Sequence, residues 1–158
     1  MLARRPIILQ WSRWALVPLA LVAAAVATPD FLTHAAPLLG LALERGFAIV
    51  CHQRPERSFA LFGATIAVCS RCLGIYLGAA VGLLFRASRT VAVRLLMLAI
   101  ALNLLDAATE LAGWHGNWLG VRFALGIMLG VTGALLIWSS SLSCALDKDN
   151  SHALSQAA

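Results

Sequence analysis

Charged residues are scarce in this sequence. Asp, Glu, Lys and Arg make up 12% of its 158 residues, whereas 61% are hydrophobic. Soluble domains carry about 25% charged residues, because most of their surface faces water. The shortage of charge therefore excludes an ordinary soluble domain. It predicts a small all-α integral membrane protein whose surface is solvated largely by the lipid bilayer.

Other absences narrow the range of functions. No basic stripe interleaved with aromatic residues is present, although the net charge is +5, so a nucleic-acid partner is excluded. Leu73, not histidine, follows the C-x-x-C motif, which makes c-type haem attachment a poor interpretation. The sequence contains no internal repeat and no pair of broken apolar helices, which disfavours a transporter.

The apolar residues form four runs. Residues 1–140 are predicted to form one membrane bundle of about four transmembrane helices, with spans near 12–29, 71–87, 91–113 and 121–139. An amphipathic segment at 36–50 is predicted to lie at the interface, and the polar residues 141–158 are predicted to form a flexible tail. The first run has a second interpretation as a cleaved signal peptide, because Ala25-Val26-Ala27 follows a basic start and an apolar core.

Basic residues indicate an orientation. Four spans place both termini on one side of the membrane. That side carries seven basic residues and the other carries five: Arg4, Arg5, Arg13, Arg86, Arg89, Arg94 and Lys148 against Arg45, Arg54, Arg57, Arg71 and Arg122. Because cytoplasmic loops carry an excess of Lys and Arg, we expect a bacterial inner-membrane protein with cytoplasmic termini.

Glycines recur every four residues in two of the runs. This spacing puts them on one helix face, where small residues let helix backbones approach closely inside a membrane. The partner of each face is another helix of the bundle or a second copy of the chain, so a homo-oligomer is one expectation. The glycines are Gly74, Gly78 and Gly82 in the second run, and Gly126 and Gly130 in the fourth.

Residues 51–72 contain three cysteines and a histidine around a predicted hairpin at Gly63. Thiolate and imidazole are the ligands that zinc prefers, and a C-x-x-C turn can hold one ion with two sulfurs. We therefore predict a zinc-type site with Cys51, His52, Cys69 and Cys72 as ligands. Because adjacent residues normally point apart, His52 fits this set of ligands less well than the three cysteines do. His34, His115, water or a carboxylate are the other candidates for the fourth position.

The cysteines also have interpretations without a metal. Cys69 and Cys72 can form a redox pair with Cys51 as the exchange partner. They can form a structural disulfide, although this leaves one cysteine of the three unpaired. All three can instead be buried free thiols. Cys144 falls on the other side of the membrane in this topology, as a free thiol or an acylation site.

The third run contains polar residues on one face. Asn103, Asp106 and Glu110 lie at positions i, i+3 and i+7, and carboxylates inside a membrane usually face the bundle interior or a wet cavity. Arg122, at the start of the next run, is the expected ion-pair partner. Asp106, Glu110 and Arg122 are the candidate catalytic residues. The candidates for binding an anion or a lipid headgroup are Arg54, Arg57 and Arg71.

Two motifs resemble a known family. The strings CHQRPERSF and CSRCLGIYLG, at residues 51–59 and 69–78, are similar to those of the small predicted membrane proteins of domain-of-unknown-function family 2085. The resemblance covers roughly residues 45–135, and Asp106, Arg122 and Gly126 look like its later marks. Ala107 departs from the pattern, because glycine is expected after the Asp. The resemblance implies a membrane protein with a Cys/His site and implies no particular activity.

Three functions fit these features. The first is a polytopic membrane protein with a zinc-type site beside an intramembrane Asp/Glu/Arg cluster, acting on a lipid or another membrane-embedded substrate. The second is a membrane thiol–disulfide oxidoreductase that uses Cys69 and Cys72 and resembles quinone-linked four-helix enzymes in outline. The third is a non-enzymatic scaffold that forms oligomers through the glycine faces.

Overall fold

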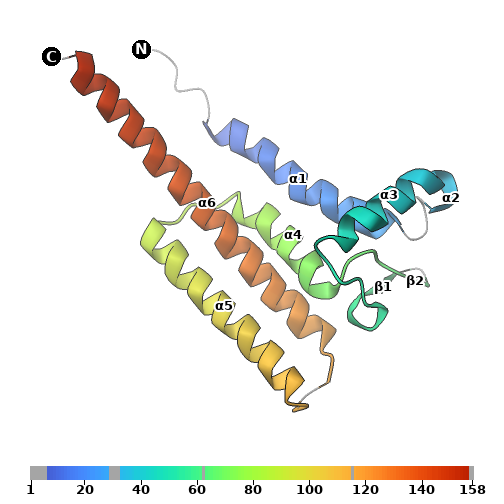
Figure 1. Cartoon of the computed structure of the whole chain (residues 1–158). Helices are drawn as coiled ribbons and strands as arrows, with labels where there is room; N and C mark the ends of the chain where they lie inside the picture. The colour runs from blue at the N-terminus through green and yellow to red at the C-terminus, as the bar shows by residue number, and fades with distance from the viewer. Residues whose placement is uncertain (1–6, 29–32, 62, 115, 157–158) are drawn as a thin grey trace.

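The computed structural model describes residues 7–28, 33–61, 63–114 and 116–156, with the backbone alone described for residues 7–15, 27, 33 and 140–156. Helices dominate it, and one small hairpin interrupts them (Figure 1). The elements in chain order are α1 (Ile7–Ala27), α2 (Thr33–Ala35), α3 (Pro37–Ala48), the 3-10 turn η2 (Pro55–Arg57), β1 (Ala60–Leu61), β2 (Ala64–Thr65), α4 (Ser70–Gly82), α5 (Arg89–Leu111) and α6 (Leu119–Gln156).

Helices α4 and α6 pack on each other through glycine. A Cβ atom built on any of five glycines would lie less than 3.0 Å from a backbone atom of the opposite helix. No real Cβ tolerates such a distance, so only glycine allows the two backbones to come this close. The glycine faces of the second and fourth apolar runs thus contact each other within one chain. The five are Gly74, Gly78 and Gly82 on α4, and Gly126 and Gly130 on α6.

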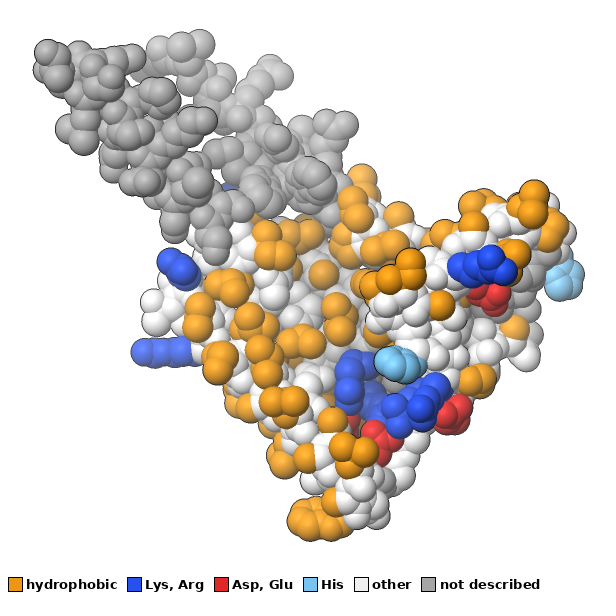
Figure 2. Space-filling view, viewed as in Figure 1, with side chains coloured by type: hydrophobic (Ala, Val, Ile, Leu, Met, Phe, Trp, Pro, Cys, Tyr) orange, Lys and Arg blue, Asp and Glu red, His pale blue; other side chains and the backbone are white. Residues whose placement is uncertain are grey.

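Two described helices are long and apolar enough to cross a membrane. They are α5 over Arg89–Leu111 and the first part of α6 over Leu119–Ser139. Only 17% of the apolar stretch of α5 and 33% of that of α6 is buried within the chain, so most of their hydrophobic surface points outward. Hydrophobic side chains accordingly cover much of the surface in Figure 2.

The expectation of four spans is not supported. Helix α4 has 13 residues, which gives a length of about 20 Å against a hydrocarbon core of about 30 Å. It ends at Gly82, well before the predicted end of the run at residue 87. In α1 the apolar stretch with described side chains is Leu16–Val26, which is also below the length of a span. The described part of the chain is thus mostly helical and contains two candidate membrane-spanning helices.

Helix α6 also departs from the expected boundary. It continues through the polar residues after Trp138 and ends at Gln156, where the sequence predicted a flexible tail. No glycine or proline follows Gly133, so this segment contains no strong helix-stop signal. Most of the segment predicted to lie at the interface forms α3, whose Leu38, Leu39 and Leu41 are exposed, and its position at the interface stays a prediction.

The segment between α3 and α4 folds back over the bundle. Gly63, with φ of +89°, forms the turn between β1 and β2, which pair antiparallel as the sequence predicts. The side-chain amide of Gln53 donates hydrogen bonds of 2.9 Å to the carbonyls of Glu44 and Ala67. The Ala67 N–H donates at 3.1 Å to the Ala25 carbonyl of α1. These bonds bring the end of α3 beside the start of α4.

The glycine packing predicts different free energies of unfolding for two matched variants. We expect Gly78→Ala to lower the stability of the detergent-solubilised protein by about 1–3 kcal/mol, because the new methyl group overpacks the α4–α6 contact. Gly133→Ala is the control, since a Cβ there meets nothing within 4 Å and alanine favours the helix by up to about 1 kcal/mol. Thermal unfolding followed by tryptophan fluorescence measures both. Equal midpoints for the two variants would contradict this packing.

Candidate metal centre and its polar surroundings

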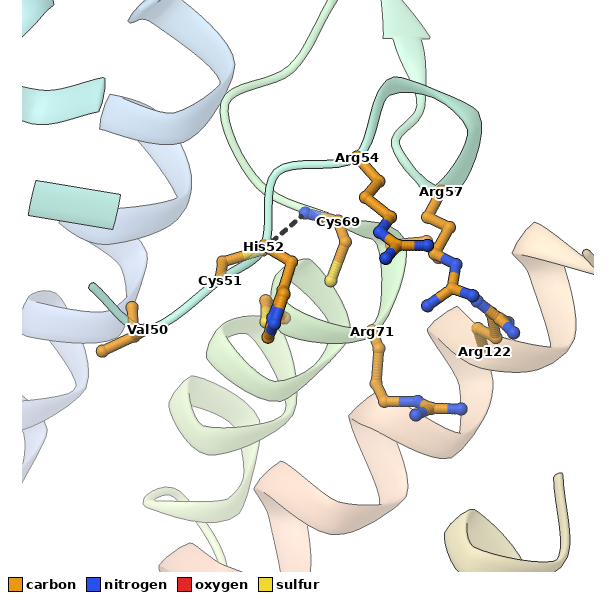
Figure 3. A pocket seen from close by; sticks show the side chains of 10 residues that line it. Val50, Cys51, His52, Arg54, Arg57, Cys69, Arg71 and Arg122 are labelled. Carbon is orange, nitrogen blue, oxygen red and sulfur yellow. Dashed lines mark hydrogen bonds between the residues drawn. The ribbon is translucent and has the colours of Figure 1, made fainter. Parts of the chain in front are cut away.

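Three cysteines from two separate segments meet at the N-terminal end of α4. Cys51 follows α3 and is 3% exposed, Cys69 precedes α4, and Cys72 lies in its first turn. Their sulfur atoms all lie within 4.8 Å of one another. The Cys69 N–H donates to the Cys51 Sγ at 3.2 Å, which joins the two segments (Figure 3). Because Zn–S bonds of about 2.3 Å place tetrahedral sulfurs about 3.8 Å apart, a small inward shift would suit one ion.

The surroundings of Cys69 favour its thiolate form. A hydrogen bond from the Cys72 thiol, helped by the Cys72 N–H and by Cys51, lowers the pKa of Cys69 from 9.0 to about 5. The thiolate is the form of cysteine that binds metals and attacks disulfides. The lowered pKa of Cys69 therefore suits either metal binding or thiol–disulfide exchange.

His52 stands apart from the sulfurs. Cys51 is buried whereas its neighbour His52 is exposed, as expected of adjacent residues that point in different directions. The group of described Cys, His and acidic side chains close enough to share an ion contains the three cysteines and not His52. His52 nevertheless lines the same cavity. Of the other histidines considered from the sequence, His34 lies outside that group as well, and His115 falls outside the described residues.

A cavity of about 320 Å³ opens beside the sulfurs. Figure 2 shows basic side chains gathered in one patch next to a few acidic ones, and Figure 3 shows the labelled arginines on one side of the cysteines. No acidic side chain lines the cavity itself. Its lining consists of Val50, Cys51, His52, Arg54, Arg57, Cys69, Ser70, Arg71, Cys72 and Arg122.

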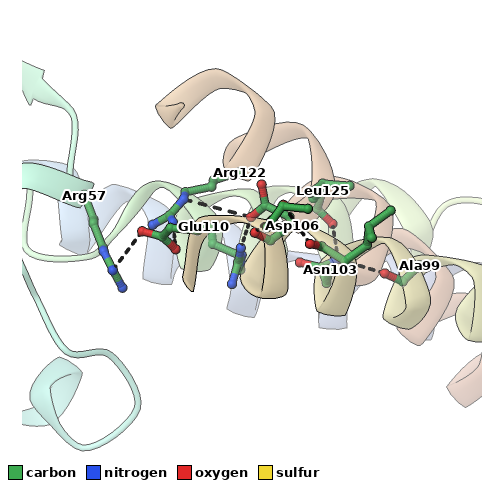
Figure 4. A network of polar contacts seen from close by, with 10 residues as sticks. Arg57, Ala99, Asn103, Asp106, Glu110, Arg122 and Leu125 are labelled. Carbon is green, nitrogen blue, oxygen red and sulfur yellow. Dashed lines mark hydrogen bonds and ion pairs between the residues drawn. The ribbon is translucent and has the colours of Figure 1, made fainter. Parts of the chain in front are cut away.

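Two carboxylates of α5 hold three of these arginines (Figure 4). Arg71 donates a hydrogen bond to Asp106 Oδ2, and the Arg122 Nε lies 4.0 Å from the same oxygen. Arg122 Nη2 pairs with Glu110 Oε2, while Arg57 Nη2 donates to Glu110 Oε1 at 2.9 Å. The ends of α4, α5 and α6 are thereby joined, with Asp106 and Arg122 almost fully buried.

The observed pairing differs in part from the expected one. Arg122 does contact Asp106, but its close partner is Glu110, and Arg71 takes the first place at Asp106. From the sequence, Arg71 was expected to bind an anion or a headgroup and not to pair with a carboxylate. The signal for this pairing was the position of Arg71 one residue before Cys72, on the side of α4 that contacts Gly126 of α6. Asn103 donates to the Leu125 carbonyl at 3.2 Å and so also links α5 to α6.

Ser70 is a further residue of the site that no sequence motif indicates. This residue is fully buried between Cys69 and Arg71, lines the cavity, and its Oγ has no hydrogen-bond partner among the described residues. The Nε atoms of Arg71 and Arg122 are likewise buried and make no hydrogen bond within the described part of the chain. Three polar groups at this cavity thus have unused hydrogen-bonding capacity.

Comparison with known proteins gives a family and no activity. An uncharacterized protein of Methanocaldococcus jannaschii is 32% identical over 60% of this chain and 65% of its own length. An uncharacterized protein of Methanothermobacter thermautotrophicus is 37% identical over 57% of this chain and 86% of its own length. No solved structure matches the chain. Residues 51–136, more than half of the chain, match the family described as predicted membrane protein (DUF2085). The chain therefore belongs to this family of predicted membrane proteins.

Proposed function

We propose that this chain is a membrane metalloprotein in which Cys51, Cys69 and Cys72 hold one zinc-type ion. The observation that carries the proposal is the meeting of three sulfurs, from segments 18 residues apart, within 4.8 Å of one another. Soft thiolate ligands select zinc or a similarly thiophilic metal over magnesium or calcium.

The coordination sphere is open toward the cavity. Three protein ligands leave a fourth tetrahedral position, which is the arrangement of catalytic more than of structural zinc sites. The fourth ligand is His52 after a side-chain rotation, a water molecule or a bound substrate. A metal ion here supplies a Lewis acid at the edge of a basic pocket.

The carboxylates of the polar cluster position the arginines. Asp106 and Glu110 are each paired with two arginines, so they serve better as anchors than as general bases. Arg122 is buried and paired with both carboxylates, and the Arg71 side chain is 30% exposed at the cavity. Arginines fixed in this way present donors to an oxyanion without losing much side-chain freedom on binding. The pocket therefore suits an anionic substrate or lipid headgroup.

A second candidate function is thiol–disulfide exchange. The lowered pKa of Cys69 and its hydrogen bond with Cys72 are features of a C-x-x-C redox pair. Forming the Cys69–Cys72 disulfide would release two electrons and two protons to an acceptor such as a membrane quinone. The scaffold hypothesis has weaker support, because the glycine faces of α4 and α6 already pack on each other.

Metal content separates these functions. In protein purified in mild detergent under reducing conditions, we expect about one zinc-type ion per chain, since one set of three sulfurs can bind one ion. Cys69→Ser and Cys72→Ser should each remove most of it, and Cys144→Ser, which changes the fourth cysteine of the sequence, should not. Inductively coupled plasma mass spectrometry measures the metal.

Absence of bound metal would decide between the two functions in the other direction. Metal-free protein in which Cys69 and Cys72 cycle between thiol and disulfide, as seen by intact mass after alkylation, would overturn the metal centre and favour the redox function.

The anchoring role of Asp106 predicts a large loss of stability. Asp106→Asn leaves Arg71 and Arg122 without their shared carboxylate and should cost about 3 kcal/mol or more, because an uncompensated buried charge is expensive. Glu44→Gln removes an exposed carboxylate on α3 and should change stability by less than about 0.5 kcal/mol. Denaturant unfolding in detergent measures both.

A double-mutant cycle completes this test. Combined with Arg71→Gln, the Asp106→Asn substitution should cost about 1–3 kcal/mol less than the sum of the two single changes. Additive effects would show that the carboxylate does not hold Arg71.

A further inference from the structure

The cavity beside the cysteines is lined by residues with buried hydrogen-bond donors that have no acceptor within the described residues. Ser70 is fully buried and Arg122 is 4% exposed, and the Ser70 Oγ and the Nε atoms of Arg71 and Arg122 make no hydrogen bond within the described residues. Leaving buried donors unsatisfied costs free energy, which a bound acceptor recovers. All three residues line the cavity.

The charge balance of the cavity favours an anion. Four arginines line it, and two carboxylates behind them pair with three of the four, which leaves an excess of two positive charges (4 − 2). Three thiolates with one divalent ion would add a net charge of −1, so the balance stays positive. Arginine forks match the geometry of phosphate oxygens, with which they form charge-assisted hydrogen bonds.

A second cavity, of about 440 Å³, lies further along α4 and is apolar. Residues of α1, of α6 and of α4 with the residue that follows it line this cavity. No charged side chain lines it. The lining residues are Val17, Pro18, Leu21, Ile75, Ala79, Leu83, Leu129, Gly130, Gly133, Ala134 and Ile137.

The two cavities share the same faces of the helices that form them. On α4, Cys72 lies at position i, and Ile75, Ala79 and Leu83 follow at i+3, i+7 and i+11, which is one helical stripe. On α6, Arg122 is followed at i+7 and i+11 by Leu129 and Gly133. Figure 3 shows α4 between α1 and α6, with the cysteine and arginine side chains at its N-terminal end.

We propose that the two cavities form one site for an anionic phospholipid. The lipid phosphate accepts hydrogen bonds from Ser70 and the arginines, and one acyl chain lies along α4 in the apolar groove. From Cys72 to Leu83 the groove follows about 16 Å of helix. This inference rests on the proposed function in one respect, that the open metal position faces the headgroup, and it names the class of substrate for that site.

The charge next to the groove favours an amphiphilic lipid over an apolar helix of another protein. The groove provides about 440 Å³ and is lined by apolar residues alone. Arg71, which lines the polar cavity, lies four residues before Ile75 of the groove. A hydrocarbon chain joined to a phosphate matches both surfaces, whereas an apolar helix would match only the groove.

Lipid binding can be measured on the purified full-length protein by native mass spectrometry. The probes are dioleoyl phosphatidic acid, dioleoyl phosphatidylcholine, and inorganic phosphate as a competitor. We expect phosphatidic acid to bind at least about tenfold more tightly than phosphatidylcholine, because charge-assisted contacts to its headgroup are stronger. Inorganic phosphate should compete weakly, since it lacks the chain that fills the groove.

Variants test the two ends of the site separately. Arg54→Gln should weaken phosphatidic acid binding about tenfold, whereas Arg89→Gln, which removes a positive charge at the opposite end of α5, should have little effect. Ala79→Phe should fill the groove and weaken the lipid without changing binding of inorganic phosphate. Leu84→Phe, at an exposed position outside the groove, is the matched control.

The outcomes distinguish this inference from the metal centre. Equal binding of the two lipids, or lipid binding that Ala79→Phe leaves unchanged, would overturn the phospholipid site. Inorganic phosphate that displaces the lipid at equal concentration would overturn it in favour of a free-anion site. Metal measured in the same samples is independent: lipid selectivity without metal would remove the metalloprotein proposal alone, and metal without lipid selectivity would remove the lipid site alone.

Discussion

The close approach of α4 and α6 is the constraint on which the rest of the structure depends. Glycine on both helices lets the backbones touch, with the Gly126 position against the backbone of Arg71 and the Gly74 position against the backbone of Phe123. This contact fixes α4 relative to α6 at their N-terminal ends. Arg71 and Arg122 are therefore brought to one level, where one pair of carboxylates on α5 can reach both.

The polar cluster explains why charge is tolerated in so apolar a chain. A lone buried carboxylate or guanidinium would cost much free energy, but Asp106 and Glu110 share their arginine partners across three elements. The same network holds three of the four arginines that line the cavity beside the cysteines. Stability and site geometry thus arise from one set of contacts.

Much of this arrangement could be predicted from the sequence, and the limits have physical reasons. The spacing of the cysteines and of the glycines is local, and so are the hairpin at Gly63 and the family motifs. The number of spans could not be obtained in this way, because hydropathy does not show that α4 ends at Gly82. The exchange of partners between Arg71 and Arg122 depends on how α4 and α6 are rotated, which pattern alone leaves open. Ser70 was missed because burial of a serine has no signature in sequence.

The position of the cysteines at the end of α4 connects the two proposals. A thiolate site deep in the bundle would have no access to water or to headgroups, and one on a free loop would lack a fixed geometry. Here Gln53 and the Ala25–Ala67 hydrogen bond hold the loop segment against the bundle, and the first turn of α4 holds Cys72. The sulfurs consequently line the polar pocket, and Cys72 lies three residues before Ile75, which lines the apolar groove. A phospholipid is an amphiphile with the same division, so a metal ion in this position would face the polar part of the molecule whose chain the groove accommodates.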